Sequence, residues 1–210
     1  MTSKPQAPRL DLLVILYGSS GTDPVGNSRF GADQRRVELK FNPRIPAEVP
    51  RDPVGIDTWA RNTLAGLFPE LKHSQKWHCE FCNKLARESQ VCTASWTHLS
   101  PPRVVSYIHL VCDTRLNTPC GRQLKEVLDE MNSITGMPPA TASNSPRVQA
   151  YFPAAASCAC CESEESIDGP MSRCSKCKLI RYCGTKCQEE DWERHKKYCK
   201  MVKEVTWTWP

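Results

Sequence analysis

The cysteines of this chain are concentrated near its C-terminus, and their spacing constrains the fold more than any other feature. Eight of the thirteen lie between Cys158 and Cys199. Two Cys-x-x-Cys pairs come first, and a Cys-x3-Cys pair and a His-x3-Cys pair follow. A segment this short cannot bury enough apolar surface to fold by hydrophobicity alone. The Cys-x-x-Cys turn directs two sulfurs at one point, and an i,i+4 pair shares one helical face, so the spacing predicts metal coordination.

The candidate ligands are seven thiolates and one imidazole, enough for two four-coordinate zinc sites. They are Cys158, Cys161, Cys174, Cys177, Cys183, Cys187, His195 and Cys199. Sites with four protein ligands leave no position for water, which is typical of structural zinc. Spacing alone leaves open whether Cys160 replaces Cys161. A disulfide framework is the rival interpretation, but the apolar run Leu12–Tyr17 is short for a secretory signal, whose core needs about 7–15 residues.

The whole pattern resembles the MYND-type zinc finger, since Tyr182, Gln188 and Trp192 match that family as well as the ligands. The resemblance implies a treble zinc-stabilised module with two short helices and a small hairpin. It also implies interleaved ligand pairs. One ion would be held by Cys158, Cys161, Cys183 and Cys187, and the other by Cys174, Cys177, His195 and Cys199.

MYND fingers are known as protein-interaction modules that take up short proline-containing segments, and transcriptional regulation is one setting for them. The residues that match the family's peptide contacts are Ser175, Gln188 and Trp192. The resemblance therefore implies partners with proline-rich segments, bound as a strand beside Leu179–Tyr182. An equal alternative for Trp192 is packing against the zinc-binding turns.

Two other functions are weaker candidates. Between Arg173 and Lys203 there are ten basic and four acidic residues, which would suit nucleic acid. However, cations are also expected beside negatively charged zinc–thiolate groups, so we expect no nucleic-acid role. Some MYND fingers belong to SET-domain lysine methyltransferases. Residues 1–150 contain no cofactor-binding motif of that class, so we expect no enzyme activity.

The preceding residues predict a small α+β domain over residues 10–136. Strands are expected at Leu10–Tyr17, Arg36–Phe41, Val91–Trp96 and Val104–Val111. Amphipathic helices are expected at Asp57–Phe68 and Gly121–Thr135. Asp57 would cap the first of these helices, and Pro69 would end it.

A further group of cysteines lies inside this predicted domain. Cys79 and Cys82 form another Cys-x-x-Cys turn, and Cys112 and Cys120 follow after the expected hairpin. These four residues, or His109 in place of one, predict a third zinc site in a zinc-ribbon-like element. The alternative is that Cys112 is a buried thiol with no metal.

The remaining segments predict flexible connections. Residues 1–9 are expected to be a disordered tail, 137–157 a linker rich in Pro, Ser and Ala, and 200–210 a second tail. Trp207 and Trp209 are expected to fold back on an apolar surface. No apolar run is long enough for a membrane helix. Because zinc thiolates need a reducing compartment, a cytoplasmic or nuclear location is expected.

Overall fold

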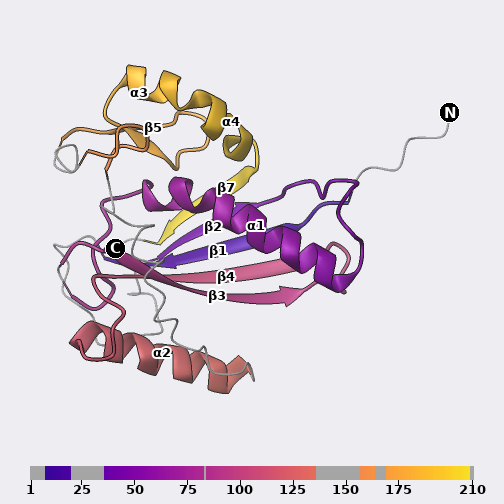
Figure 1. The fold of residues 1–210 in the computed structure, drawn as a ribbon. Helices are drawn as coiled ribbons and strands as arrows, with labels where there is room; N and C mark the ends of the chain where they lie inside the picture. The colour runs from indigo at the N-terminus through magenta and orange to yellow at the C-terminus, as the bar shows by residue number, and fades with distance from the viewer. Residues whose placement is uncertain (1–7, 20–35, 83, 136–156, 164–168, 209–210) are drawn as a thin grey trace.

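The computed structural model describes residues 8–19, 36–82, 84–135, 157–163 and 169–208 (Figure 1). The predicted linker therefore lies almost entirely outside the described residues, as do residues 1–7 of the predicted N-terminal tail. The remaining segments form a five-stranded sheet, a helix on each of its sides, and a small C-terminal unit that lies over α1. Among the described residues, no helix has both the length and the apolar character needed to cross a membrane.

The sheet has the strand order β3-β4-β1-β2-β7. Its strands are Glu88–Trp96 (β3), Arg103–Val111 (β4), Asp11–Tyr17 (β1), Arg36–Phe41 (β2) and Val202–Thr208 (β7). Strands β1 and β4 are parallel, and the other neighbours are antiparallel. The four strands predicted in the N-terminal region are present, with bounds shifted by up to three residues.

The prediction of a C-terminal tail at residues 200–210 is wrong, because Val202–Thr208 form strand β7. It pairs antiparallel with β2, with Leu39 opposite Val205, and forms one edge of the sheet. Trp207 on this strand stacks against Trp77, with ring centroids 6.5 Å apart. The chain therefore returns to the N-terminal sheet after the cysteine-rich unit, and the expected folding back of Trp207 occurs through strand pairing. Trp209 lies outside the described residues.

Helix α1 (Pro53–Lys72) covers one face of the sheet and is longer than the predicted helix Asp57–Phe68. Its cap is Asp52, whose carboxylate accepts a hydrogen bond of 2.8 Å from the backbone N–H of Gly55. Neither predicted end is correct, because Asp57 lies in the second turn and Pro69 lies inside the helix. The helix therefore continues for another turn past Pro69, toward the C-terminal unit.

Helix α2 (Pro119–Thr135) lies on the opposite side of the sheet from α1 (Figure 1). Its bounds differ by two residues at the N-terminal end from those of the predicted helix, Gly121–Thr135. Among the described residues, a small apolar cluster packs against α2, in which Val111 of β4 meets Leu124 and Leu128, together with Cys79 and Cys120.

The C-terminal unit contains the hairpin of β5 (Ser172–Arg173) and β6 (Arg181–Tyr182), followed by α3 (Thr185–Glu190) and α4 (Trp192–Cys199). It lies against α1, on the same side of the sheet (Figure 1). Leu179, Ile180 and Tyr182 of this unit belong to the same buried apolar cluster as Leu67 and Leu71 of α1. One core therefore extends from the sheet through α1 into the cysteine-rich unit.

Candidate metal centres

The first cluster consists of Cys158, Cys161, Cys183 and Cys187, whose sulfurs all lie within 4.8 Å of one another. The sulfurs of Cys161 and Cys183 are 3.9 Å apart, and those of Cys183 and Cys187 are 3.5 Å apart. A tetrahedral site with Zn–S bonds of about 2.3 Å places its sulfurs about 3.8 Å apart. The four thiols therefore fit one zinc ion, and Cys161 and Cys183 are exposed to solvent.

The second cluster consists of Cys174, Cys177, His195 and Cys199, and all four side chains are buried. The sulfurs of Cys174 and Cys199 are 4.0 Å apart, and Nε2 of His195 lies 3.8 Å from the sulfur of Cys177. In a tetrahedral zinc site this sulfur–nitrogen separation is about 3.6 Å. The structure thus groups the eight residues in the interleaved arrangement that the family resemblance implied.

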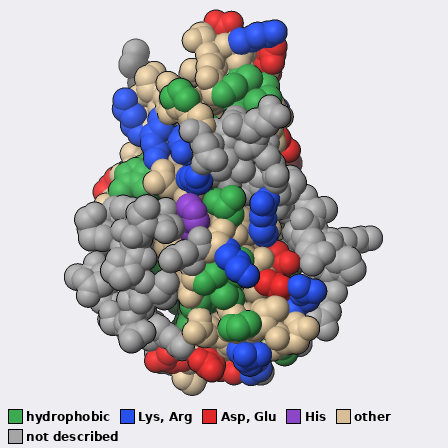
Figure 2. All heavy atoms as spheres, turned by 90° about the vertical axis from the view of Figure 1, so that its left-hand side faces the viewer, with side chains coloured by type: hydrophobic (Ala, Val, Ile, Leu, Met, Phe, Trp, Pro, Cys, Tyr) green, Lys and Arg blue, Asp and Glu red, His purple; other side chains and the backbone are tan. Residues whose placement is uncertain are grey.

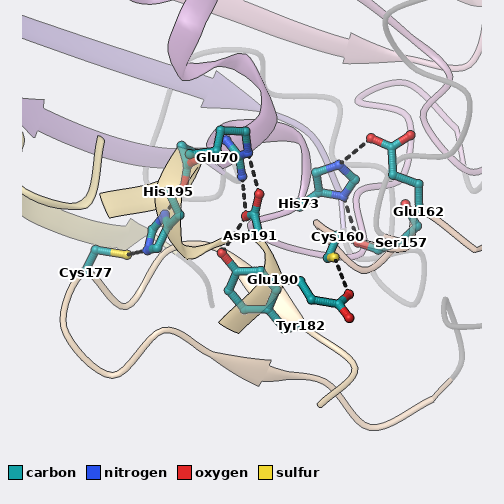
Figure 3. Close-up of polar contacts among 11 residues, drawn as sticks. Glu70, His73, Ser157, Cys160, Glu162, Cys177, Tyr182, Glu190, Asp191 and His195 are labelled. Atoms are coloured by element: carbon teal, nitrogen blue, oxygen red, sulfur yellow. Dashed lines mark hydrogen bonds and ion pairs between the residues drawn. The ribbon is translucent and has the colours of Figure 1, made fainter. Parts of the chain in front are cut away.

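Cys160 is not part of the first cluster. Its thiol lies 3.5 Å from a carboxylate oxygen of Glu190, and it is grouped with Cys187 and Glu190 (Figure 3). The geometry therefore favours Cys161, rather than Cys160, as the second sulfur of the first Cys-x-x-Cys turn.

The backbone around the two leading cysteines favours the thiolate form that a zinc ligand needs. Burial opposes ionisation of Cys158, but hydrogen bonds from the backbone of Cys161 and Cys183 outweigh it and bring the pKa of Cys158 to about 7. For Cys174, backbone bonds from Cys177 and a bond from His195 likewise overcome burial and lower the pKa to about 7. These turns therefore prepare both thiols for a cation.

A third cluster lies between the sheet and α2 and consists of Cys79, Cys82, Cys112 and Cys120, with all sulfurs within 4.8 Å of one another. The sulfurs of Cys82 and Cys112 are 3.7 Å apart. Burial raises the pKa of Cys79 to about 12, so this thiol needs a nearby cation in order to ionise. The donor set is again four thiols at tetrahedral spacing.

His109, the alternative ligand for this third cluster, lies outside it. Its Nδ1 is 2.8 Å from a carboxylate oxygen of Glu80, and its ring stacks on Tyr17 with centroids 5.0 Å apart. Its Nε2 is buried and has no hydrogen-bond partner among the described residues. The histidine instead packs behind the Cys79–Cys82 turn, because Glu80 belongs to that turn.

The residues predicted to contact a peptide lie in the hairpin turn and on the two short helices. Ser175 is exposed and Gln188 is half-buried. Trp192 is 40% exposed, and the edge of its ring contacts His195 at a centroid distance of 5.9 Å. Trp192 therefore packs beside the second cluster and remains partly accessible, while its contact with a peptide stays a prediction.

Sequence reasoning missed three polar residues around the second cluster. Glu70 of α1 is 1% exposed and accepts hydrogen bonds from His195 and Arg194. Arg194 also donates to Asp191, which accepts a further bond of 2.8 Å from the hydroxyl of Tyr182 (Figure 3). The acidic residue four positions before His195 was visible in the sequence, but no local signal indicated that Glu70 would reach it.

Comparison with known proteins identifies the C-terminal unit. The sequence model of the MYND finger matches residues 158–199. A SET and MYND domain-containing protein of Dictyostelium discoideum is 46% identical over 35 residues, which are 17% of this chain and 6% of that protein. Human histone-lysine N-methyltransferase SMYD3 is 46% identical over 33 residues, or 16% of this chain and 8% of its own length.

A third relative, human Protein CBFA2T2, is 58% identical over 26 residues, which are 12% of this chain and 4% of that protein. This chain thus covers less than a tenth of the length of each of these relatives. No solved structure matches the chain. The family match and the converging sulfur and nitrogen atoms agree on the same residues, so residues 158–199 are a MYND finger whose ligand groups are suited to zinc.

Proposed function

We propose that this protein is a zinc-dependent interaction module without catalytic activity, whose finger binds a proline-containing segment of a partner protein in the cytoplasm or nucleus. The observation that supports this proposal most directly is the position of Trp192. Its indole is 40% exposed, and the ring is oriented edge-to-face with the buried ring of His195. Proline rings pack well on such accessible aromatic faces.

The partner segment binds through side chains rather than by extending the finger's hairpin. The backbone N–H of Arg181 donates to His73 at 3.2 Å, and its carbonyl accepts from Ala159 at 3.1 Å. The other edge of this segment is bonded to β5, as in the bond of 2.9 Å from Cys174 to Ile180. The expectation of a strand added beside Leu179–Tyr182 is therefore wrong at Arg181. A polyproline II segment, which makes no ladder of backbone hydrogen bonds, suits this surface better.

The test is a fluorescence-anisotropy titration of a labelled proline-rich peptide into the zinc-loaded chain. The substitution Trp192→Ala should weaken binding by about thirtyfold, since loss of a central aromatic contact costs about 2 kcal/mol. The matched control is Trp96→Ala, because Trp96 is also 40% exposed but lies on β3, away from the finger. Equal affinities for the two variants, or no binding by the unsubstituted chain, would overturn the proposal.

Nucleic acid is the competing ligand, and the same titration examines it. On the face drawn in Figure 2, the described lysine and arginine side chains lie in separate groups with apolar and polar side chains between them. A nucleic-acid surface normally has a more continuous basic stripe. If a labelled oligonucleotide bound more tightly than the peptide, with a steep dependence on salt, nucleic acid would be the ligand of the finger instead of a peptide.

The absence of catalysis is the second part of the proposal. The relatives named for SET domains and for lysine methyltransferase activity share only the finger with this chain, so their activity does not transfer through the match. Calorimetry with S-adenosylmethionine should give no heat of binding. A stoichiometric binding signal would show that the sheet is a cofactor-binding domain and would contradict this part of the proposal.

The third part concerns the number of metal ions, which we put at three. The third cluster offers four thiols at zinc spacing, and a tetrahedral set of four sulfurs is typical of zinc or iron. Zinc there would join the Cys79–Cys82 turn and the end of β4 to the start of α2. That link matters because, in the part of the chain that the structure describes, the apolar cluster between α2 and the sheet is small.

Metal analysis of the purified chain tests this count. Three zinc ions are expected per unsubstituted chain, and two after the double substitution Cys79→Ser and Cys112→Ser. The control is Cys92→Ser, since Cys92 is a half-buried cysteine of β3 that belongs to none of the clusters. Two ions in both the unsubstituted chain and the double variant would mean that the third cluster is a group of buried thiols. If the purified protein were coloured and contained iron, the metal of the third cluster would be iron rather than zinc.

A further inference from the structure

Glu70 is a buried carboxylate that lies outside the finger but contacts one of its ligands. It occupies the last turn of α1 and is 1% exposed. A carboxylate buried to this extent is strongly destabilising unless both oxygens are paired. Each oxygen has its own partner from the finger: Oε1 lies 2.5 Å from a guanidinium nitrogen of Arg194, and Oε2 lies 2.7 Å from Nδ1 of His195 (Figure 3).

These contacts determine which ring nitrogen of His195 faces the other ligands of the second cluster. An ionised carboxylate can only accept, so Nδ1 of His195 must carry the proton that it donates to Glu70. In the neutral imidazole the other nitrogen, Nε2, then carries no proton, and it lies 3.8 Å from the sulfur of Cys177 in the second cluster. A neutral imidazole in this tautomer is the form that binds zinc.

We propose that Glu70 is the positioning residue of the second cluster, so that the N-terminal domain completes the metal centre of the finger through the chain Glu70–His195–zinc. The proposal depends on zinc occupancy of the second cluster, but not on peptide binding. Carboxylate partners of this kind orient the ligand ring and raise its basicity, and their loss typically lowers metal affinity about 10–100-fold.

The charges around the site support this role. Three thiolates and a neutral imidazole around a divalent ion leave one net negative charge, and Glu70 adds another. Arg194 offsets part of this charge, since it bonds to Glu70 and, through two further nitrogens, to Asp191 at 2.6 and 2.7 Å. Glu70 therefore has a cationic partner of its own beside the anionic metal site.

The shape of α1 also fits this function. Gly66 lies one helical turn before Glu70 and therefore on the same face. A Cβ atom at Gly66 would lie 2.3 Å from the hydroxyl of Tyr198 on α4, so the glycine permits the close approach of the two helices. That close approach brings the carboxylate of Glu70 within hydrogen-bonding distance of His195.

The test compares Glu70→Gln with Asp57→Asn in the full-length chain. Asp57 is the other acidic residue of α1, and its partners are Arg61 and Ser95 rather than the finger. Chelator competition in the cobalt-loaded protein distinguishes the second cluster, which has one histidine ligand, from the two all-cysteine clusters by their visible spectra. Glu70→Gln should weaken cobalt and zinc binding at the second cluster about 10–100-fold and leave binding at the all-cysteine clusters unchanged. Asp57→Asn should leave binding at all three clusters unchanged.

A second readout isolates positioning from a purely structural ion pair. In the cobalt protein, the Nδ1 proton of His195 should give a strongly shifted NMR signal that exchanges slowly with solvent, because Glu70 holds it in a buried hydrogen bond. The signal should persist in Arg194→Lys, which disturbs the ion pair but leaves the bond from His195 to Glu70. It should broaden or exchange rapidly in Glu70→Gln.

Three outcomes would overturn the proposal. They are unchanged affinity at the second cluster in Glu70→Gln, an equal loss at all three clusters, and a rapidly exchanging Nδ1 proton in the unsubstituted cobalt protein. The last measurement needs no variant, so a Glu70→Gln chain that fails to fold does not remove the test. Failure of zinc binding itself is distinguishable, because the unsubstituted chain would then show no cobalt spectrum from a site with a histidine ligand.

Discussion

The two metal clusters of the finger have similar ligand spacing but different surroundings. Two of the four sulfurs of the first cluster are exposed, and the residue before its first ligand, Ser157, has its carbonyl oxygen 2.7 Å from Nδ1 of His73. All four ligands of the second cluster are buried, and one of them is hydrogen-bonded to α1. The first cluster is therefore partly open to solvent, whereas the second is enclosed at the junction of the finger with the rest of the chain. Similar sequence motifs can thus depend on the remainder of a protein to very different degrees.

The largest expected effect comes from removing one ligand of each cluster. Cys177→Ser should abolish the second site, leave Glu70 facing an empty site, and destabilise the sheet as well, because β7 follows α4 within a few residues. Cys161→Ser should remove one ion but leave the melting of the sheet nearly unchanged. Structural zinc contributes on the order of 10 kcal/mol, so the loss in Cys177→Ser should be large.

Thermal unfolding followed by far- and near-ultraviolet circular dichroism, together with metal analysis, checks this difference. An equal fall in the melting temperature of the sheet in both variants would mean that the two clusters are coupled to it equally. A two-step transition in Cys177→Ser, with the sheet unaffected, would mean that the finger is an independent unit despite its contacts.

The next largest effect concerns Arg173, which directly precedes the ligand Cys174 and joins the finger to the sheet through Trp207 of β7. Its guanidinium donates to the carbonyl of Ser74 at 2.5 Å and to the side chain of Gln75 at 2.7 Å, and it stacks on Trp207 of β7 at 4.5 Å. Arg173→Lys keeps the charge but loses the planar fork, and should lower the free energy of unfolding by about 1–3 kcal/mol.

Arg61→Lys is the control for this change, because Arg61 is an exposed arginine of α1 whose partner is Asp57. The control should change stability by no more than about 0.5 kcal/mol. Urea unfolding of both variants at neutral pH measures the difference. Equal midpoints would show that the buried contacts of Arg173 do not hold the finger to the sheet.

A smaller effect is expected at the contact between α1 and α4. Gly66→Ala adds a Cβ atom that would lie 2.3 Å from the hydroxyl of Tyr198. The strain should cost about 1–3 kcal/mol, partly offset by the higher helix propensity of alanine, about 1 kcal/mol. In a Tyr198→Phe background the closest atom is gone, so Gly66→Ala should become neutral or slightly stabilising.

A double-mutant cycle of Gly66→Ala and Tyr198→Phe, measured by urea unfolding, isolates this contact. A coupling energy near zero would mean that α4 shifts freely over α1, and that the close approach of the two helices is not fixed. Such a result would also weaken the argument that α1 positions Glu70 against His195.

The features that the sequence could predict are those that depend only on residues close together in the chain. Ligand spacing such as that of Cys174 and Cys177 is a property of a single turn. The strands of the sheet also have alternating or continuous apolar patterns that need no partner to be recognised. The strand Arg36–Phe41, for example, was predicted with the bounds that the structure has.

The features that joined the finger to the sheet could not be predicted, because they depend on distant partners. Pro69 normally ends a helix, yet α1 continues to Lys72, where Glu70 pairs with Arg194 and His195 of the finger. Strand β7 is a polar, alternating segment that forms only because β2 offers it an edge. Both depend on residues more than a hundred positions away in the chain.

The smallest expected effect tests whether surface charge helps to hold β7 on the sheet. Lys40 of β2 and Glu204 of β7 are directly opposite each other, with the ammonium nitrogen 3.0 Å from a carboxylate oxygen, and both are half exposed. The hydrogen bond and charge of Lys40 lower the pKa of Glu204. Since the folded-state pKa is lowered, the stabilisation is present above the pKa of the unfolded carboxyl group. It is lost as the pH falls through the lowered folded-state value.

Glu204→Gln should therefore lower the melting temperature slightly at pH 7, and the difference should vanish at acidic pH and in about 0.5 M salt. Glu193→Gln is the matched control, because Glu193 pairs with Lys196 inside α4 and joins no separate elements. An effect independent of pH and salt would mean that Glu204 does not act through its charge. A large effect that vanishes at acidic pH and in salt would mean that β7 is held mainly by surface charge. The buried contacts at Arg173 and Glu70 would then not be the main link between the finger and the sheet.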